Sequence, residues 1–484
     1  MKNNLLKHVF TLGLMSSFLL GGCATLENVT DRINPFGNDN EKGQGDVAGA
    51  DQRISLLSLD EQLQVTGEIT PDQIALPPAY VNTDWPQVGG NLAHVMQHTG
   101  ASGPLNKAWS RGVGKGSSRK GRVLAQPVVS GNRIFVMDAD NRVAAYDIAG
   151  GEKIWDHKIT VELKGKTREG RASLVERITN PTQALADRGG SDTESVGGGV
   201  AVYGDKIIAT SGLGVVEALD INTGEALWRK RTISPMHSAP AVSDGRIFAV
   251  TDDNELMAFN ANTGDVLWTY QGIIESARML TAPVPAVVDD VVISPFASGE
   301  VVALRVQNGG VLWQDALSAA GRLTPLSSLN DIAAGPVVAD GFVIVSAQSG
   351  VMTAMDLRTG QRIWNQPAGS LSFPLVVGDF VYTATTDSQI VCMSKLNGSV
   401  VWMQQLQSFK NEKKRKDRIA WSGPIIAGDR LVTVSSQGKV VQLNPYTGAI
   451  ISESDVGGSV FIPPLIANET VFVLNDDAKL IALR

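Results

Sequence analysis

Hydrophobic and polar residues alternate along much of the chain after residue 85, in short runs separated by turn-forming residues. Two examples are residues 246–250 (Arg-Ile-Phe-Ala-Val) and 255–260 (Glu-Leu-Met-Ala-Phe-Asn). An alternation with a period of two places the hydrophobic side chains on one face of a β-strand. Glycine, aspartate and asparagine between the runs favour tight turns. The pattern therefore predicts an all-β fold of many short strands.

These strands belong to a unit that repeats along the chain. Its clearest copy runs from Ser238 to Trp268 and contains a proline after a small residue, alternating strands, a turn at Asn262-Thr263-Gly264, and a final Val-Leu-Trp. The final position of each copy is occupied in turn by Trp155, Trp228, Trp268, Trp313, Trp364, Trp402 and Ser452. From Trp228 on, consecutive tryptophans lie 40, 45, 51 and 38 residues apart. This period suits one four-stranded blade of a β-propeller.

The eighth copy is incomplete, and a distant segment supplies what it lacks. It begins at Pro464, and the chain ends at Arg484 before any further turn or tryptophan. Residues 105–110 (Leu-Asn-Lys-Ala-Trp-Ser) resemble the missing outer strand. Pairing the two segments would hide both edge strands. We predict that residues 85–484 form an eight-bladed β-propeller of four-stranded blades, closed by pairing an N-terminal strand with the C-terminal blade.

The turn before the outer strand carries a glycine in most copies. These glycines are Gly224, Gly264, Gly360, Gly398 and Gly448. Such turns need a positive φ, which glycine adopts with least strain. We expect the tryptophan that follows to pack over the neighbouring blade and to donate its indole N–H to a backbone acceptor there.

The first residues resemble a bacterial export signal. Lys2 and Lys7 give a basic start, and residues 9–20 form an apolar run, which is too short for a membrane span of about 20 residues. Leu20-Gly21-Gly22-Cys23 resembles the lipobox of bacterial lipoproteins. We therefore expect residues 1–22 to be a signal peptide and Cys23 to carry a lipid anchor. A secretory signal followed by an unrelated cysteine is the alternative.

The residues after Cys23 bear on location. In enteric bacteria an aspartate after the lipidated cysteine tends to retain lipoproteins in the inner membrane, and here that position is Ala24. We therefore expect an anchor at the periplasmic face of the outer membrane. We also expect a flexible tether over residues 23–84, because residues 38–51 are rich in Gly, Asn, Asp and Glu and cannot bury enough apolar surface to fold. The other cysteine, Cys392, is expected to be a small buried hydrophobic residue.

Charge excludes one class of partner. The chain has 42 basic and 49 acidic residues, a net charge of −7, whereas nucleic acid is bound by a basic surface.

Two segments interrupt the repeat. The polar insert at 161–196 is predicted to be a long loop, and residues 409–418, which include Lys413-Lys-Arg-Lys416, are predicted to be a solvated loop rather than a binding patch.

The repeat Ala-[Leu/Phe/Tyr]-[Asp/Asn]-x-x-x-Gly-x-x-[Leu/Ile]-Trp resembles that of pyrroloquinoline-quinone (PQQ) dehydrogenase propellers. Together with the lipobox and eight blades, the chain resembles the BamB family of lipoproteins. That resemblance implies a non-enzymatic scaffold of the outer-membrane β-barrel assembly machine, without a cofactor. Its implied partners are the POTRA domains of BamA, other assembly components and unfolded outer-membrane proteins. It also implies a monomer within a larger complex.

The family binds BamA through a loop that reads Leu-x-Leu-Arg-Gly-x-Ser-x-Pro. The matching stretch here is Glu275-Ser-Ala-Arg-Met-Leu-Thr-Ala-Pro283, so Arg278 and Pro283 match while the leucines do not. In the next blade's lead-in, Asp331 matches the first acid of the family's Leu-Ser-Asp-Val-Asp. The partner-binding candidates are therefore Arg278, Asp331, Ile273, Ile274 and Met279. The alternative is that Arg278 pairs with Asp331 inside the propeller.

Two other functions compete with the scaffold. A PQQ-dependent quinoprotein dehydrogenase needs a carboxylate base and oxygen ligands for Ca²⁺. Several acids fall instead in turn positions beside a glycine, where turn formation explains them: Asp205, Asp244, Asp340, Asp379 and Asp429. A sensor propeller that binds a ligand, such as a carbohydrate, in its central channel remains open. His94 and His98 are four residues apart and are expected to be surface groups near the tether, because two histidines make a weak metal site. No metal site and no catalytic residue are predicted.

Overall fold

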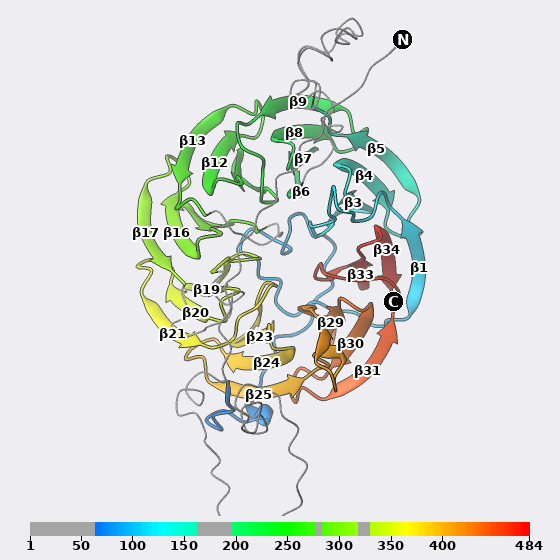
Figure 1. Cartoon of the computed structure of the whole chain (residues 1–484), viewed down its shortest axis with the longest axis vertical. Coiled ribbons are helices and arrows are strands. Elements are labelled where there is room, and N and C mark those ends of the chain that lie inside the picture. Colours follow the sequence, from blue (N-terminus) through cyan, green and yellow to red (C-terminus); the bar gives the residue numbers. More distant parts are fainter. Residues whose placement is uncertain (1–62, 162–195, 276–282, 318–329) are drawn as a thin grey trace, which may run out of the picture. The chain divides into compact units, whose positions relative to one another are not determined.

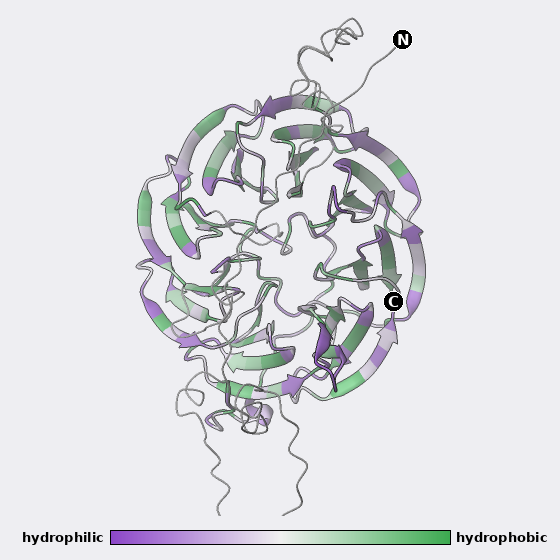
Figure 2. Cartoon of the chain, viewed as in Figure 1, coloured by the Kyte–Doolittle hydropathy of each residue, from purple (hydrophilic) through white to green (hydrophobic). Residues whose placement is uncertain are grey.

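The computed structural model describes residues 63–161, 196–275, 283–317 and 330–484. These residues form eight four-stranded antiparallel sheets, the blades, around a central axis (Figure 1). The eight-bladed β-propeller predicted from the repeat is thus confirmed. In each blade the first strand lies nearest the axis, and Figure 2 shows hydrophilic residues recurring along the outer strands, whose outward side meets water.

The blades follow the chain order. Blade 1 is β2 (Val128–Ser130), β3 (Arg133–Met137), β4 (Arg142–Asp147) and β5 (Lys153–Lys158); blade 2 is β6 (Gly198–Tyr203), β7 (Lys206–Ser211), β8 (Val215–Asp220) and β9 (Ala226–Arg231); blade 3 is β10 (Ala241–Ser243), β11 (Arg246–Val250), β12 (Glu255–Asn260) and β13 (Val266–Gln271); blade 4 is β14 (Ala286–Val288), β15 (Val291–Pro295), β16 (Glu300–Arg305) and β17 (Val311–Ala316). Blade 5 is β18 (Val337–Ala339), β19 (Phe342–Ser346), β20 (Met352–Asp356) and β21 (Arg362–Gln366); blade 6 is β22 (Leu375–Val377), β23 (Phe380–Ala384), β24 (Gln389–Ser394) and β25 (Val400–Gln405); blade 7 is β28 (Trp421–Ile426), β29 (Leu431–Ser435), β30 (Lys439–Leu443) and β31 (Ile450–Asp455).

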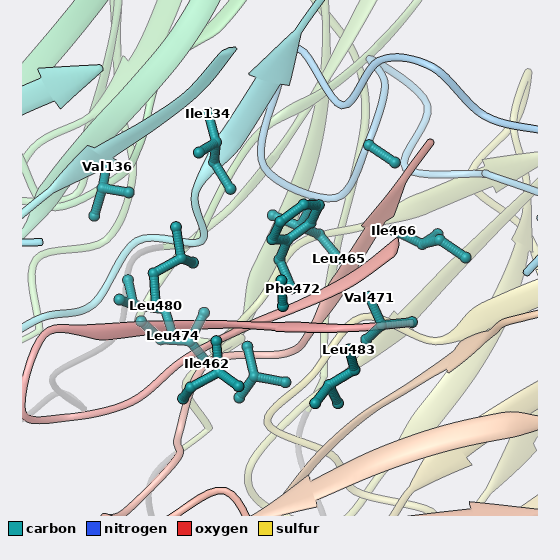
Figure 3. Packing of buried hydrophobic residues seen from close by; sticks show 14 of the residues in the cluster. Ile134, Val136, Ile462, Leu465, Ile466, Val471, Phe472, Leu474, Leu480 and Leu483 are labelled. Carbon is teal, nitrogen blue, oxygen red and sulfur yellow. The ribbon is translucent and has the colours of Figure 1, made fainter. Parts of the chain in front are cut away.

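Blade 8 closes the ring. Its strands are β32 (Leu465–Ala467), β33 (Thr470–Leu474), β34 (Lys479–Leu483) and, from the other end of the sequence, β1 (Lys107–Gly112). β1 pairs antiparallel with β34, with Trp109 opposite Ala482. Figure 3 shows how side chains of blade 8, such as Phe472 and Leu480, pack near Ile134 and Val136 of blade 1. The predicted pairing of the two chain ends is therefore confirmed.

Tryptophans connect neighbouring blades as the repeat predicted. Six indole Nε1 atoms donate to a backbone carbonyl in the next blade: Trp155 to Ile221 (3.0 Å), Trp228 to Ala261 (3.1 Å), Trp268 to Val306 (3.0 Å), Trp313 to Leu357 (2.7 Å), Trp364 to Lys395 (2.8 Å) and Trp402 to Pro445 (3.1 Å). Each ring also lies against the turn glycine of that next blade. One blade therefore fixes the position of the following one through a buried, hydrogen-bonded aromatic contact.

Blade 7 lacks the tryptophan for a structural reason. Ser452 occupies its position, opposite Gln442. The turn on which a tryptophan would dock lies between the third and fourth strands of the next blade. In blade 8 those strands, β34 and β1, come from opposite ends of the chain, so no turn joins them. Arg430 and Gln442 instead contact the incoming chain, at the carbonyls of Gly103 and Pro104.

Cys392 occupies a position that is alanine in every other blade with an outer-strand tryptophan. The residue opposite the outer-strand tryptophan is alanine in six blades: Ala145, Ala218, Ala258, Ala303, Ala354 and Ala482. In blade 6 it is Cys392, opposite Trp402 and fully buried. Burial raises the pKa of the Cys392 thiol, which keeps it in the neutral form. The expectation of a small buried hydrophobic residue is confirmed.

A pair of turn glycines tests how much the tryptophan contact contributes. Gly245 and Gly264 both have a φ of +73°. A Cβ at Gly264 would lie 2.6 Å from Cε3 of Trp228, whereas a Cβ at Gly245 would meet nothing within 4 Å. We expect Gly264→Ala to lower the free energy of unfolding by about 1–3 kcal/mol more than Gly245→Ala, since only the first adds an overpacking cost to the shared backbone strain. Urea unfolding of both variants measures the difference, and equal losses would contradict the docking role.

The segment before β1 runs once around the inside of the ring. We call residues 82–103 the inner belt. It hydrogen-bonds to the innermost strand of a blade, or to the turn that follows it, in the order of the blades: Asn82 with blade 8, Trp85 with blade 1, Pro86 with blade 2, Gln87 with blade 3, Leu92 with blade 4, Ala93 with blade 5, Gln97 with blade 6 and Thr99 with blade 7. The innermost strands are edge strands with unpaired N–H and C=O groups. The belt supplies partners to these edges in all eight blades.

The folded part begins earlier than residue 85, where the sequence placed the end of the tether. The compact unit spans Leu59–Arg484. Within it the Thr66 amide donates to the Val400 carbonyl at 3.2 Å, one turn of 3-10 helix forms at Pro71–Gln73, and Ile74 packs into the core between blades 6 and 7. The proline-rich end of the expected tether thus buries enough apolar surface to lie against the propeller.

Candidate partner-binding face

The two ends of the ring differ in what they carry. Within a blade, the turns after the first and third strands lie at one end, and the turn after the second strand lies at the other. Each blade-to-blade connection starts and finishes at that second end, because it follows the fourth strand and precedes the next first strand. We call this end the connection face. Loops on a rigid scaffold are the usual location of binding residues.

Ile273 and Ile274, two of the partner-binding candidates, are exposed on this face, in the connection from blade 3 to blade 4. Their exposed fractions are 61% and 70%. The backbone of Ile273 is held between the two blades: its N–H donates to Oε2 of Glu300 at 2.7 Å, and its carbonyl accepts from Nδ2 of Asn254 at 2.6 Å. Glu300 also accepts from Ser298. Both isoleucine side chains are exposed, and the backbone of Ile273 is fixed between the two blades.

Asp331 lies beneath the connection face and not on it. Its exposed fraction is 1%, and its carbonyl accepts the amide of Gln348 at 2.9 Å. A buried carboxylate must be compensated by the groups around it, and these contacts fix the conformation of its own loop. Arg278 and Met279 lie outside the described residues, as do Cys23 and most of the insert at 161–196. The structure brings Ile273 and Ile274 together and places Asp331 in the adjacent connection.

Two exposed apolar residues of this face were missed by the sequence reading. Ile233 has an exposed fraction of 107%, and Phe461 one of 50%. Ile233 follows Trp228 by five residues, as Ile273 follows Trp268. Aligning the copies on their tryptophans would have revealed this repeated apolar position. Exposed apolar side chains gathered on one face are typical of interaction surfaces.

A cavity of about 260 Å³ lies on the axis at the connection face. Its lining is mainly apolar and includes Leu124, Leu371 and Phe373. The amide of Gln126 is already fully used: Nε2 donates to the carbonyls of Pro463 and Pro464, and Oε1 accepts from Trp85 and Gly89. Among the described residues of the lining the one acid is Asp476, which lies 3.9 Å from Arg122. These residues do not fit a quinone with a calcium ion, which needs several oxygen ligands.

The expectation that His94 and His98 are surface groups was wrong. Both are buried, and the chain there is not helical. Nδ1 of His94 lies 2.6 Å from the Pro336 carbonyl, and its ring packs against Phe373. Nε2 of His98 lies 2.9 Å from the Gly428 carbonyl. Burial lowers the pKa of His94 to about 4, so it is neutral at pH 7. Both rings hold the inner belt to the blades.

No group of three or more His, Cys, Asp or Glu side chains suited to a metal occurs among the described residues. Nor does that part of the chain contain a helix with the length and apolarity to cross a membrane.

Comparison with known proteins decides the family. A family model described as outer membrane protein assembly factor BamB matches residues 107–188, 171–404 and 406–484. The chain belongs to the BamB family. The BamB proteins of Yersinia pestis and Salmonella typhimurium are each 26% identical to it; the matches cover 76% and 78% of this chain and 86% and 88% of the respective relatives.

Solved structures agree on the fold. BamB from Moraxella catarrhalis superposes with a TM-score of 0.61 at 18% identity, over 78% of this chain and 99% of that one. A europium-containing methanol dehydrogenase gives a TM-score of 0.58 at 14% identity, over 81% and 89%. The propeller is therefore shared between BamB proteins and dehydrogenases, and the fold alone does not distinguish the two functions.

Proposed function

We propose that this BamB-family chain is a non-enzymatic scaffold of the outer-membrane β-barrel assembly machine, which binds the POTRA domains of BamA through its connection face. The observation that carries the proposal is the exposed pair Ile273 and Ile274, of which Ile273 is hydrogen-bonded through its backbone to blades 3 and 4. Apolar anchors on a rigid backbone lose little conformational entropy on binding. Membership of the BamB family supports the assembly role.

The remaining site residues have distinct roles in this proposal. Arg278, three residues beyond Glu275, forms a charge-assisted hydrogen bond to the partner, and Met279 adds an adaptable apolar contact. Asp331 is a positioning residue, because its carboxylate is buried. The central cavity supports no quinone chemistry, so the scaffold is the function that the site favours.

The scaffold is anchored in the outer membrane and faces the periplasm. Cys23, released from the signal peptide 1–22, carries the lipid, and the residues up to the compact unit at Leu59 form the tether. The protein acts as a monomer within a complex that includes other assembly components, and it contacts unfolded outer-membrane proteins. It needs no cofactor.

Replacement of the apolar pair tests the proposed contact. We expect Ile273→Asp with Ile274→Asp to weaken binding to purified BamA POTRA domains at least about tenfold, because two apolar anchors become charged. Binding is measured by surface plasmon resonance with the full chain. The matched control is Val65→Asp with Leu396→Asp, which changes two similarly exposed residues, 51% and 56%, away from the connection face. Unchanged affinity for the first double variant would remove this site.

A second variant tests the proposed role in barrel assembly. Arg278→Glu is expected to abolish co-isolation with the barrel-assembly complex from detergent-solubilised envelopes. A chain of natural sequence that isolates without any assembly component would argue against the function, whereas an unaffected Arg278→Glu complex would argue only against the residue.

A further inference from the structure

The chain joins the central cavity to a basic hairpin at residues 409–418, which ends two residues before Ala420 of the cavity lining. We propose that the two form a second binding site for an acidic peptide segment of a partner protein, which inserts one large apolar side chain into the cavity and places its carboxylates against the hairpin. The site is distinct from Ile273 and Ile274, and it does not depend on BamA being the partner of that pair.

The cavity recognises apolar groups. Four large side chains, Leu124, Leu371, Phe373 and Phe461, line it while each remains partly or largely exposed. A folded protein rarely leaves several such side chains converging on one opening unless the opening binds something. Leu124 lies in the connection from blade 8 to blade 1, and Phe461 in that from blade 7 to blade 8.

The uncharged polar side chains of the described lining, Gln126 and Ser422, are already hydrogen-bonded within the protein. All four hydrogen-bonding positions of the Gln126 amide are occupied within the protein. The Ser422 hydroxyl donates to the Phe461 carbonyl at 2.8 Å. A sugar placed here would lose its hydrogen bonds to water without replacing them. The cavity therefore selects an apolar group, and its 260 Å³ lies below the about 300–1,000 Å³ of pockets for drug-sized ligands. One large side chain fits this size better than a long lipid chain.

The hairpin that precedes Ala420 along the chain has a defined structure. Residues 409–418, expected to be a solvated loop, form strands β26 (Phe409–Asn411) and β27 (Lys416–Arg418). Oε1 of Glu412 accepts the amides of Ser408 and Phe409, both at 3.0 Å. Arg418 donates to the Thr386 carbonyl and lies 3.1 Å from Oδ1 of Asp387, in a turn of blade 6. The hairpin is thus folded and attached to the ring.

Apart from Arg418, which pairs with Asp387, the positive charge of the hairpin lies on exposed side chains. Residues 409–418 contain six Lys or Arg and two acids, a net charge of 6 − 2 = +4 in a chain of net charge −7. Lys410, Lys413, Lys414 and Lys416 are exposed, and none of them forms an ion pair with another described residue. Four lysines on a rigid hairpin repel one another, and an anionic partner would relieve this repulsion.

The hairpin and the cavity are close along the chain. Ala420 lines the cavity, and Lys416 precedes it by four residues, at most about 13 Å of extended chain. Within the described lining Arg122 is the cation, and it lies 3.9 Å from the carboxylate of Asp476. An apolar cavity that the chain joins to a basic hairpin is complementary to a segment with one apolar side chain and flanking carboxylates. A peptide side chain and its neighbours span this distance, which commits the site to a peptide rather than a membrane surface.

A synthetic peptide tests the proposal directly. The probe is biotinylated GSDEFDEGS, immobilised and exposed to the full chain in biolayer interferometry. We expect saturable binding that weakens at least about tenfold when the phenylalanine becomes serine, and again when the acids become their amides. On the protein, Lys413→Glu with Lys414→Glu and, separately, Ala420→Leu, which fills the cavity, are each expected to reduce binding at least about tenfold.

Two control variants distinguish this site from a general charge effect and from the isoleucine pair. Lys107→Glu with Arg305→Glu makes the same change in net charge at the opposite end of the ring and is expected to leave peptide binding intact. Ile273→Asp with Ile274→Asp is also expected to bind the peptide normally, so that a failed BamA contact and a failed peptide site are distinguishable. Binding that ignores the phenylalanine, or hairpin-dependent binding to phosphatidylglycerol vesicles without peptide binding, would overturn the proposal.

Discussion

A chain that begins at residue 105 is expected to be at least about 5 kcal/mol less stable than one that begins at residue 63. The longer chain keeps the inner belt, and the shorter one loses it but retains β1. Removing Trp85 alone, which is buried against blade 1, should cost about 3–5 kcal/mol. The loss of belt hydrogen bonds to all eight blades adds to this, because edge groups in the narrow channel lose their partners.

Urea unfolding followed by tryptophan fluorescence gives the comparison. A chain that begins at residue 63 serves as the control, since the removed residues 1–62 precede all the contacts described for the ring. We expect it to unfold at the same urea concentration as the chain that begins at Cys23. If the chain from residue 105 matched it, the belt would be a passive filling of the channel and would not contribute to closing the blades.

The second large effect is expected for Trp402→Ala, which should lower the free energy of unfolding by about 3–5 kcal/mol. Trp402 is 5% exposed, packs against Tyr382 and Gly448, and donates to the Pro445 carbonyl. Its loss leaves a cavity between blades 6 and 7 and an unpaired carbonyl. The measurement is again urea unfolding of purified protein.

Ser452→Ala is the matched control, since Ser452 holds the same strand position in blade 7 without a docking turn opposite it. We expect a change within about 0.5 kcal/mol, as for a surface substitution. A large loss for Ser452→Ala, or a small one for Trp402→Ala, would contradict the account of how consecutive blades are fixed.

The sequence predicted the ring because seven of the eight blades are each formed by residues that are close together in the sequence. A strand pattern, a turn glycine and a tryptophan recur within about forty residues, so Trp228 and Gly264 could be assigned to neighbouring blades without a structure. Even the closure was readable, because Trp109 supplied the piece missing after Arg484. Local periodicity also explains why Cys392 was recognised as a core residue.

The inner belt was not predictable in the same way. Its residues have no period. Asn82, Gln87 and Thr99 each hydrogen-bond to a different blade, at sequence separations of 384, 155 and 327 residues. His94 looked like a surface group because its burial depends on Pro336 and Phe373. The site was predicted only in part for the same reason. Ile273 and Ile274 could be located from a motif, whereas the burial of Asp331 depends on the fold around Gln348.

The belt and the closing strand have a consequence for biosynthesis. Nδ2 of Asn82 donates to the carbonyl of Ile466, 384 residues later, and Lys107 pairs with Leu483. The inner belt and β1 are therefore synthesised long before their partners in blade 8, and long-range pairing of this kind is slow. The ring therefore cannot close on a nascent chain until residues 465–483 have been synthesised. Before that point Asn82 and β1 have no partners in blade 8, so closure of the ring has to follow synthesis of the last blade.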